Sequence, residues 1–348
     1  MKTKFGVTMP ILNQEYTTFP KMAKAAEDAG FDSVWDYEFY RNRFVIHGLT
    51  SQVTSRIALA TGLATTINRT PFEMANAALD IDELSGGRTI LGIGMGAAGF
   101  ADVFTGGPYD HPAPRIREYI QAMRCAWRHL DTGEPVEFSG KYHSFATPPF
   151  NPFGGRRSVI RQDIPVYVAA LRPTMLKLAG EVADGVIGYM MTPRFVTEMV
   201  IPNITEGARR AGRDPSTIDI ASETICSISD DRDEAYRRAR IQVGIYMSYP
   251  VSAPLVDIMG LQSEREAVLQ APDDQGSGRA AGRGGRQARR RVQHHRHPGR
   301  GPQEGRRVRG QAAAHPAAHP VRAAAGAGRQ RRRLRQHREH LLPMTTSR

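Results

Sequence analysis

The chain has 348 residues and a formal net charge of +12, and this charge lies in its C-terminal part. Residues 1–271 hold 28 Lys and Arg against 31 Asp and Glu, whereas residues 272–348 hold 19 Arg, no Lys and 4 acidic residues. The longer part therefore gives no electrostatic reason to expect nucleic-acid binding. It contains no apolar run of 18 residues, so no transmembrane helix is predicted, and we expect a soluble, cytoplasmic protein.

Short apolar runs alternate with helical patterns through residues 1–271, which is typical of βα units around a parallel sheet. The pattern predicts strands at 4–9, 33–36, 57–66, 89–95, 165–170, 185–189 and 218–228. It predicts helices at 22–29, 70–85, 116–130, 175–183, 195–211 and 234–242, and a hairpin at 136–145. This order predicts an α/β fold, the TIM (β/α)8 barrel, in which the eighth strand is not visible.

The helix expected at residue 70 has the best-defined start. Thr70 can cap it, Pro71 suits its first turn, and Glu73 completes a capping box. Gly86 and Gly87 then mark its end.

Residues 272–348 contain no Ile, Phe, Tyr, Trp, Asn or Cys and hold 7 of the 11 His. Such a segment cannot offset its ordering entropy and reads as disordered, and its Arg could attract phosphates as a nucleic-acid arm. We favour a third interpretation, a frameshift near Ala271. Read one nucleotide out of step, the codons for 292–298 permit Phe-Asn-Ile-Thr-Gly-Thr-Pro, and the same shift later permits a strand-like His-Ile-Gln-Leu-His. We predict a barrel domain at 1–271 and an Arg-rich tail at 272–348.

The chemistry of a TIM barrel sits at the C-terminal ends of its strands. The expected ends are Met9, 36–38, 62–64, 94–96, 170–172, Tyr189 and the region of Thr224. They are rich in small residues and poor in acids, His and Cys, and no metal-ligand or Ser-His-Asp pattern stands out. Cys125 and Cys226 lie far apart, and Cys125 falls on the apolar side of a helix. This profile suits a barrel that holds a large planar cofactor and no metal.

Gly92, Gly94 and Ala97 match a dinucleotide-binding pattern, but they follow the fourth expected strand and precede a Pro-containing loop. A Rossmann unit would open a crossover helix at once. We therefore interpret these glycines as positions where a ring approaches the strand end.

Four segments are distinctive: Ala26–Ser33, Ala58–Ala64, Asp82–Gly94 and Leu178–Gly185. Together they resemble the bacterial luciferase-like family of flavin and deazaflavin oxidoreductases. His111-Pro112, Arg115 to Tyr119 and Thr192-Pro193-Arg194 resemble its actinobacterial subgroup that uses coenzyme F420. The resemblance implies a luciferase-like TIM barrel with F420 at its mouth, FMN being the alternative cofactor.

The resemblance also implies site residues. It implies ring contacts from Asp36 and from Thr61-Gly62-Leu63-Ala64, a strand end that in the family often carries a non-prolyl cis peptide. It implies a phosphate side at Ala170-Leu171-Arg172-Pro173-Thr174, where a helix N-terminus favours an anion and Arg172 adds a donor. The remaining cofactor-binding candidates are Met9, Gly94, Met95, Gly96 and Tyr189. The candidate proton partners are Tyr37, Glu38 and His111.

A structural role is the alternative for each site residue. Asp36 could pair locally, Arg172 could be a solvated charge, Thr174 a helix cap and Tyr189 a packing residue. His47 and His111 read more readily as structural residues in loops beside the mouth.

We predict an oxidoreductase that transfers a hydride between F420 and a small organic substrate, and that forms a homodimer if the barrel is complete. The alternatives are an FMN-dependent monooxygenase, a protein that binds nucleic acid through the tail, and a protein that is inactive because its barrel lacks the eighth strand. The deazaflavin-dependent glucose-6-phosphate dehydrogenases have a His where this chain has Tyr37, and a Glu within 96–99, where this chain has only Gly and Ala. Sugar-phosphate oxidation is therefore not expected.

Overall fold

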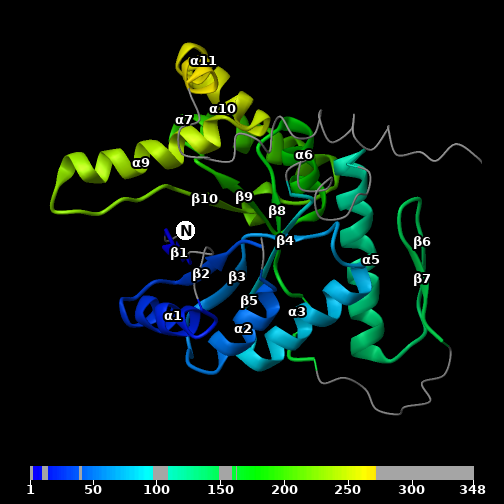
Figure 1. Cartoon of the computed structure of the whole chain (residues 1–348). Coiled ribbons are helices and arrows are strands. Elements are labelled where there is room, and N and C mark those ends of the chain that lie inside the picture. Colours follow the sequence, from blue (N-terminus) through cyan, green and yellow to red (C-terminus); the bar gives the residue numbers. More distant parts are fainter. Residues whose placement is uncertain are drawn as a thin grey trace, which may run out of the picture. The chain divides into compact units, whose positions relative to one another are not determined.

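The computed structural model describes residues 3–9, 15–38, 41–96, 109–148, 159–161 and 163–271. Within these residues, parallel strands pair in chain order to form the curved sheet of Figure 1. They are β1 (Gly6–Thr8), β2 (Ser33–Asp36), β3 (Ala58–Thr61), β5 (Thr89–Gly94), β8 (Val166–Ala169), β9 (Gly185–Tyr189) and β10 (Asp219–Glu223). The short β4 (Ala64–Thr65) also pairs with β5, and β6 (Glu137–Ser139) pairs with β7 (Ser144–Ala146) in the expected hairpin.

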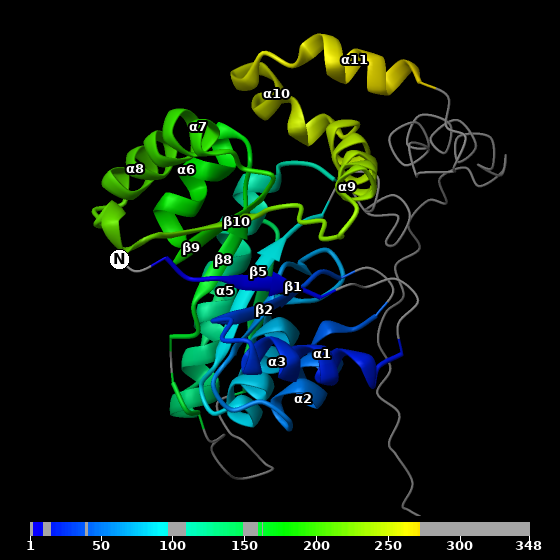
Figure 2. The same ribbon diagram turned by 90° about the vertical axis from the view of Figure 1, so that its left-hand side faces the viewer.

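Helices lie on the outer face of the sheet and at one end of its strands (Figures 1 and 2). They are α1 (Thr18–Asp28), α2 (Arg43–Ser51), α3 (Pro71–Ser85), α5 (Pro112–Thr132), α6 (Pro173–Val182), α7 (Pro193–Phe195), α8 (Ile201–Arg210), α9 (Arg232–Met247), α10 (Ala253–Met259) and α11 (Gln262–Gln270). Figures 1 and 2 show α9, α10 and α11 at one end of the strands, away from α1, α2 and α3. No helix in the described ranges has both the length and the apolar character needed to cross a membrane.

The core has two layers, as a TIM barrel requires. Inside the sheet lies the inner cluster, made of Trp35, Ala60, Tyr167 and Ile187. Outside it, a larger cluster packs the opposite strand faces against the helices, with residues such as Val34, Leu59, Leu91 and Val186. Neighbouring residues such as Val34 and Trp35 thus face opposite sides, because side chains alternate along a strand. The predicted TIM-barrel fold class is confirmed.

The third strand is divided where a single strand at 57–66 was expected. β3 ends at Thr61, a cis peptide joins Gly62 to Leu63, and β4 starts at Ala64. The Thr61 hydroxyl donates to the Gly92 carbonyl oxygen at 2.7 Å. A Cβ atom on Gly92 would overlap the carbonyl oxygen of Thr61. Gly92 is therefore required by the close approach of β3, a packing reason that does not involve a cofactor ring.

The expected start of α3 is confirmed. The Glu73 backbone N–H donates to the Thr70 hydroxyl at 3.2 Å, Pro71 is the first helical residue, and Gly86 ends the helix in the left-handed region with φ 69°. The Glu73 side chain instead faces Arg69, whose Nε lies 3.4 Å from Oε2.

Several other boundaries were predicted wrongly. α2 was not predicted, and His47 lies within this helix and not in a loop. The helix expected at 195–211 is interrupted by a π-helical turn at Val196–Val200. α9 is longer than the expected 234–242, whereas β10 is shorter than the expected 218–228.

β1 and β10 are the two ends of the strand order within the described residues, so each keeps one edge unpaired in the sheet. This agrees with the seven strands expected from the sequence, and the edges flank the seam where an eighth strand would close the barrel. The tail lies outside the described residues. The division at 271 and the frameshift therefore stay predictions.

Restoring the shifted reading frame after codon 271 is expected to raise the melting temperature and sharpen the unfolding transition, because an eighth strand would pair both open edges. Deleting 272–348 from the 348-residue chain is expected to leave its melting temperature unchanged. Circular dichroism melts of the three proteins measure this. Equal melting temperatures for the 348-residue chain and the frame-restored chain would contradict this expectation.

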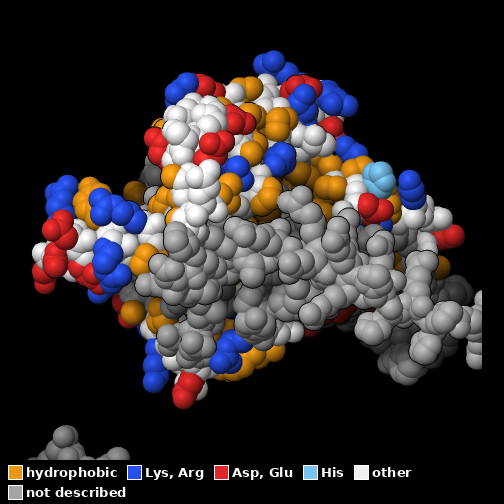
Figure 3. Space-filling model, turned by 45° about the horizontal axis from the view of Figure 1, so that its top comes forward, with side chains coloured by type: hydrophobic (Ala, Val, Ile, Leu, Met, Phe, Trp, Pro, Cys, Tyr) orange, Lys and Arg blue, Asp and Glu red, His pale blue; other side chains and the backbone are white. Residues whose placement is uncertain are grey.

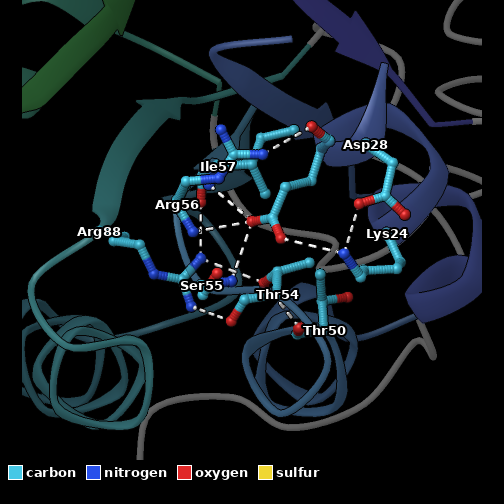
Figure 4. A network of polar contacts seen from close by, with 9 residues as sticks. Lys24, Asp28, Thr50, Thr54, Ser55, Arg56, Ile57 and Arg88 are labelled. Atoms are coloured by element: carbon cyan, nitrogen blue, oxygen red, sulfur yellow. Dashed lines mark hydrogen bonds and ion pairs between the residues drawn. The ribbon is translucent and has the colours of Figure 1, made fainter. Parts of the chain in front are cut away.

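A buried carboxylate fixes the entry to β3, at the N-terminal end of that strand (Figure 4). Glu27 of α1 accepts the backbone N–H groups of Ser55, Arg56 and Ile57 at 2.7–3.0 Å. Burial alone would raise the pKa of Glu27, but these three donors outweigh it and lower the pKa to about 2. Arg88 ties the same loop down through the carbonyl oxygens of Thr54 and Ile57.

The substitution Glu27→Gln is expected to lower the free energy of unfolding at pH 7 by about 2–3 kcal/mol, since hydrogen bonds to a charged acceptor are lost. Because the folded pKa of about 2 lies below the ordinary 4.5, the stabilisation is present at neutral pH. It disappears as pH falls from about 4.5 towards 2. Urea unfolding across this range measures both effects. Asp28→Asn, at the exposed neighbouring residue, is the control, and its free energy of unfolding is expected to lie within about 0.5 kcal/mol of wild type. If the difference in free energy of unfolding between Glu27→Gln and wild type did not change with pH, the lowered pKa of Glu27 would be refuted.

Candidate active site at the barrel mouth

The site follows from the inner cluster by strand periodicity. Residues further along the same face of each strand point to the same side and lie closer to the C-terminal strand ends. We call these residues the mouth ring: Thr8, Tyr37, Gly62, Gly94, Ala169, Tyr189 and Glu223, one from each barrel strand or its end. This is the level at which TIM barrels carry their chemistry.

One half of the mouth ring is apolar and low in relief. β3, β5 and β8 contribute Gly62, Gly94 and Ala169. A Cβ atom on Gly94 would lie 3.0 Å from the Ala169 Cβ and 3.1 Å from Leu63 Cδ2, so Leu63 covers the glycine closely. A Cβ on Gly62 would lie 3.3 Å from the Trp35 ring. Glycine or alanine at these three strand positions therefore leaves this half with little side-chain bulk of its own.

The other half is polar and comes from the strands beside the seam. Thr8 of β1 and Glu223 of β10 meet there, and the Thr8 hydroxyl donates to Glu223 Oε1 at 3.1 Å. Burial raises the pKa of Glu223 to about 7, an effect that the Thr8 hydroxyl only partly offsets. Burial is the larger cause that raises the pKa of Tyr37, and the negative charge of Glu223 is the second. The positive charge of Arg43 offsets part of that rise.

A stacked tyrosine pair borders the polar half. The rings of Tyr189 and Tyr246 lie 3.7 Å apart between centroids and 18° from parallel, so α9 is packed over the end of β9. Tyr189 pairs in register with Glu223. Burial raises the pKa of Tyr189 to about 12, so its phenol remains protonated at neutral pH. Tyr189 therefore packs against Tyr246, in agreement with the packing role that was the alternative for this residue.

Asp36 forms a buried polar group with two residues of α2. His47 Nε2 lies 3.0 Å from Asp36 Oδ1, and Arg43 NH1 lies 3.5 Å from Asp36 Oδ2, with all three side chains at most 1% exposed. Within the described part of the chain, Asp36 Oδ2, His47 Nδ1 and the three guanidinium nitrogens of Arg43 lack hydrogen-bond partners. The local-pair alternative for Asp36 therefore has a structural basis, while the unpartnered atoms leave capacity for a ligand.

Glu38 is held by other residues. Arg69 donates to both of its oxygens at 2.6 Å, and the backbone and hydroxyl of Thr65 donate at 2.9 and 2.8 Å. Burial would raise the pKa of Glu38, but Arg69 and Thr65 outweigh it and lower the pKa. An ionised, fully engaged carboxylate is a poor proton donor, so we do not retain Glu38 as the proton partner.

The predicted phosphate side lies at the start of α6. Ala170 is buried and Leu171 half-buried, whereas Arg172 and Thr174 are exposed. Arg172 precedes the helix without capping it through its side chain, and its guanidinium donates to the Pro250 carbonyl oxygen at 2.6 Å. The backbone N–H groups of the first helical turn remain available to an anion here.

The remaining candidates occupy varied positions. Met9, Ala64 and Met95 are buried in the outer core, and Gly96, with φ 73°, accepts a hydrogen bond from the Tyr109 hydroxyl at 2.9 Å. His111 is exposed at the start of α5 with φ 47°, and its carbonyl oxygen accepts the Arg115 N–H at 3.1 Å. No contact brings the His111 side chain to the mouth ring among the described residues, so we do not retain it as a proton partner. No cluster of three or more His, Cys, Asp or Glu suited to a metal occurs in the described ranges.

Sequence reasoning missed three residues of this region: Glu223, Arg43 and Tyr246. Glu223 directly precedes Thr224, where the strand end was expected, and could have been found by asking which side chain faces inward there. Arg43 carries no distinct signal, because its burial results from the packing of α2 on the sheet. Tyr246 lies beyond the helix end that was predicted.

The described surface carries charged side chains of both signs. On the face that Figure 3 shows, Lys and Arg are interspersed with Asp and Glu. This distribution agrees with the near-balanced charge of residues 1–271.

Comparison with known proteins assigns the chain to a family. The sequence model described as Luciferase-like monooxygenase matches residues 3–308. The chain belongs to the luciferase-like monooxygenase family. The resemblance inferred from the sequence and the luciferase-like barrel are both confirmed.

Relatives within the luciferase-like family include F420-dependent enzymes. The 5,10-methylenetetrahydromethanopterin reductase of Methanopyrus kandleri is 34% identical over 266 residues, which cover 72% of this chain and 73% of that protein. The solved structure of the coenzyme F420 dependent tetrahydromethanopterin reductase from Methanopyrus kandleri has a TM-score of 0.69 at 30% identity, covering 81% of this chain and 83% of that one. The oxygenating constituent of 3,6-diketocamphane monooxygenase of Pseudomonas putida, in complex with FMN, shares the fold alone, with a TM-score of 0.60, 18% identity and coverage of 78% and 81%.

In this luciferase-like barrel, Arg43→Met is expected to destabilise the fold by about 3 kcal/mol, because it leaves the Asp36 carboxylate buried beside an apolar side chain. Adding Asp36→Asn is expected to recover part of that loss. Urea unfolding measures both variants. Arg194→Met, which breaks the exposed pair with Glu198, is the control with a cost below about 1 kcal/mol. An Arg43→Met protein as stable as wild type would show that the buried pair contributes nothing.

Proposed function

We propose that the protein is an F420-dependent oxidoreductase that transfers a hydride between the deazaflavin and a small organic substrate. The observation that carries the proposal is the division of the mouth ring into an apolar, low-relief half and a polar half. A planar cofactor requires a flat apolar surface, whereas a polar substrate requires hydrogen-bonding groups. The two halves of the mouth ring would provide these next to each other. The 30–34% identity to F420-dependent reductases supports F420 as the planar partner.

The residues present fit such a cofactor. Gly62, Leu63, Gly94 and Ala169 would lie against the ring system, and the start of α6 with Arg172 would receive its phosphate. When bound, the reduced deazaflavin supplies the hydride. The protein orients the substrate beside the ring and provides donors from the polar half.

An FMN-dependent monooxygenase is the second candidate. It is favoured by the fold shared with the Pseudomonas putida monooxygenase constituent, whose structure is a complex with FMN. A smooth surface also accepts an isoalloxazine ring, so the two candidates differ in the ligand bound and not in the surface required.

The purified protein is expected to bind F420 and not FMN, as measured by fluorescence titration with each. Ala169→Leu places bulk on the apolar half and is expected to weaken F420 binding at least about tenfold. Ala267→Leu on the exposed face of α11 is the control and should bind as wild type does. Binding of FMN with oxygen consumption and no binding of F420 would establish the monooxygenase instead.

A further inference from the structure

Glu223 is the carboxyl group of the mouth ring. It ends β10, on the same strand face as Ala221, which packs against the inner cluster, and Asp219, which accepts a hydrogen bond from the inward Tyr167 hydroxyl at 2.6 Å. This alternation directs Glu223 into the mouth. Within the part of the chain that the structure describes, the Glu223 carboxyl accepts one side-chain hydrogen bond, from the Thr8 hydroxyl at 3.1 Å, so packing does not require an acid there.

The groups that surround Glu223 come from every neighbouring element. They are Thr8 of β1, Tyr37 after β2, Tyr189 of β9 and Tyr246 of α9, with the Arg43 guanidinium of α2 near Tyr37. Burial comes first among the causes that raise the pKa values of all three tyrosines, and Glu223 adds to each rise. These phenols are therefore protonated at neutral pH. Glu223 itself, with a pKa raised by burial to about 7, exists in both forms there.

Protonated phenols beside a carboxylic acid are hydrogen-bond donors. Such a set stabilises an oxygen on which negative charge develops, and it does not suit a cationic substrate. We propose that Glu223 is the catalytic proton donor and acceptor of the site, and that the substrate is a small carbonyl compound or the matching alcohol. This inference rests on the proposed F420-dependent function, and it names the substrate class for that function.

The proton and electron balance is complete. In the reducing direction the carbonyl carbon gains a hydride from the reduced deazaflavin, and the π pair of the C=O bond moves to oxygen. That oxygen takes the proton of the Glu223 carboxyl, and solvent returns a proton to the carboxylate. In the oxidising direction the Glu223 carboxylate takes the hydroxyl proton as the hydride leaves carbon for the oxidised cofactor. A catalytic acid with a pKa near the working pH serves both directions.

The test uses the full chain with reduced F420 and cyclohexanone as the neutral ketone probe. Wild-type kcat/KM is expected to fall as pH rises through about 7, where Glu223 loses its proton. Glu223→Gln is expected to lower kcat about a hundredfold and to abolish this pH dependence, with F420 affinity unchanged. Thr8→Val removes the donor that lowers the pKa of Glu223, so the falling limb should move to higher pH.

A readout independent of turnover accompanies the kinetics. Infrared difference spectra of the protein without cofactor should show a carboxyl C=O band that titrates near pH 7 and is absent from Glu223→Gln. Asp219→Asn, which removes the other inward carboxyl of β10, is the matched control and should retain both the band and the pH profile. A melting curve shows that each variant is folded.

Three results would overturn the proposal. One is a carboxyl band that persists in Glu223→Gln, another is a Glu223→Gln enzyme as fast as wild type, and the third is a wild type that binds F420 but leaves cyclohexanone unreduced. Failure to bind F420 at all would instead refute the proposed function. In that case the infrared titration would still decide whether Glu223 exchanges its proton near neutral pH.

Discussion

The barrel mouth depends on one packing contact beneath it, that of Trp35 against Tyr167. Their ring centroids lie 5.8 Å apart, and they come from β2 and β8, strands that do not pair with each other. This contact across the barrel interior fixes the spacing of strands that share no hydrogen bonds. Because side chains alternate along each strand, the residues two positions further on then converge. Tyr37 and Glu223 belong to one site for this reason, although 185 residues of chain separate them.

The elements that the sequence predicted well are those with local causes. The Thr70 cap and the Pro71 that follows it act within one helical turn, so the start of α3 could be located from its own residues. α2 has no such signal, because its sequence mixes the β-branched Val45 and Ile46 with Gly48, which are poor helix formers. It forms nonetheless, with Asn42 as its cap and Ile46 fully buried against the sheet. Tertiary packing overrides propensity there, and packing cannot be read from a single sequence.

The candidate site was predictable where it repeats a family pattern and not where it depends on a boundary. The strand end at Thr61 to Ala64 was located from its resemblance, including the cis peptide found at Gly62–Leu63. Glu223 was overlooked because the end of the last strand was given only as the region of Thr224, within a strand expected to run to Ile228, so its last inward side chain was not identified. An error of a few residues at a strand end thus concealed a carboxyl group, since the last inward residue of a barrel strand is the one that reaches the site.

The Thr8–Glu223 hydrogen bond crosses the seam between β1 and β10, the two open edges of the sheet. Closure of the barrel and protonation of Glu223 are therefore linked equilibria. Any strand or partner that fills the seam removes water from the carboxyl group and raises its affinity for a proton. By reciprocity, a proton on Glu223 strengthens the closure by the same free energy. The acidity of this one side chain thus reports how completely the barrel is closed.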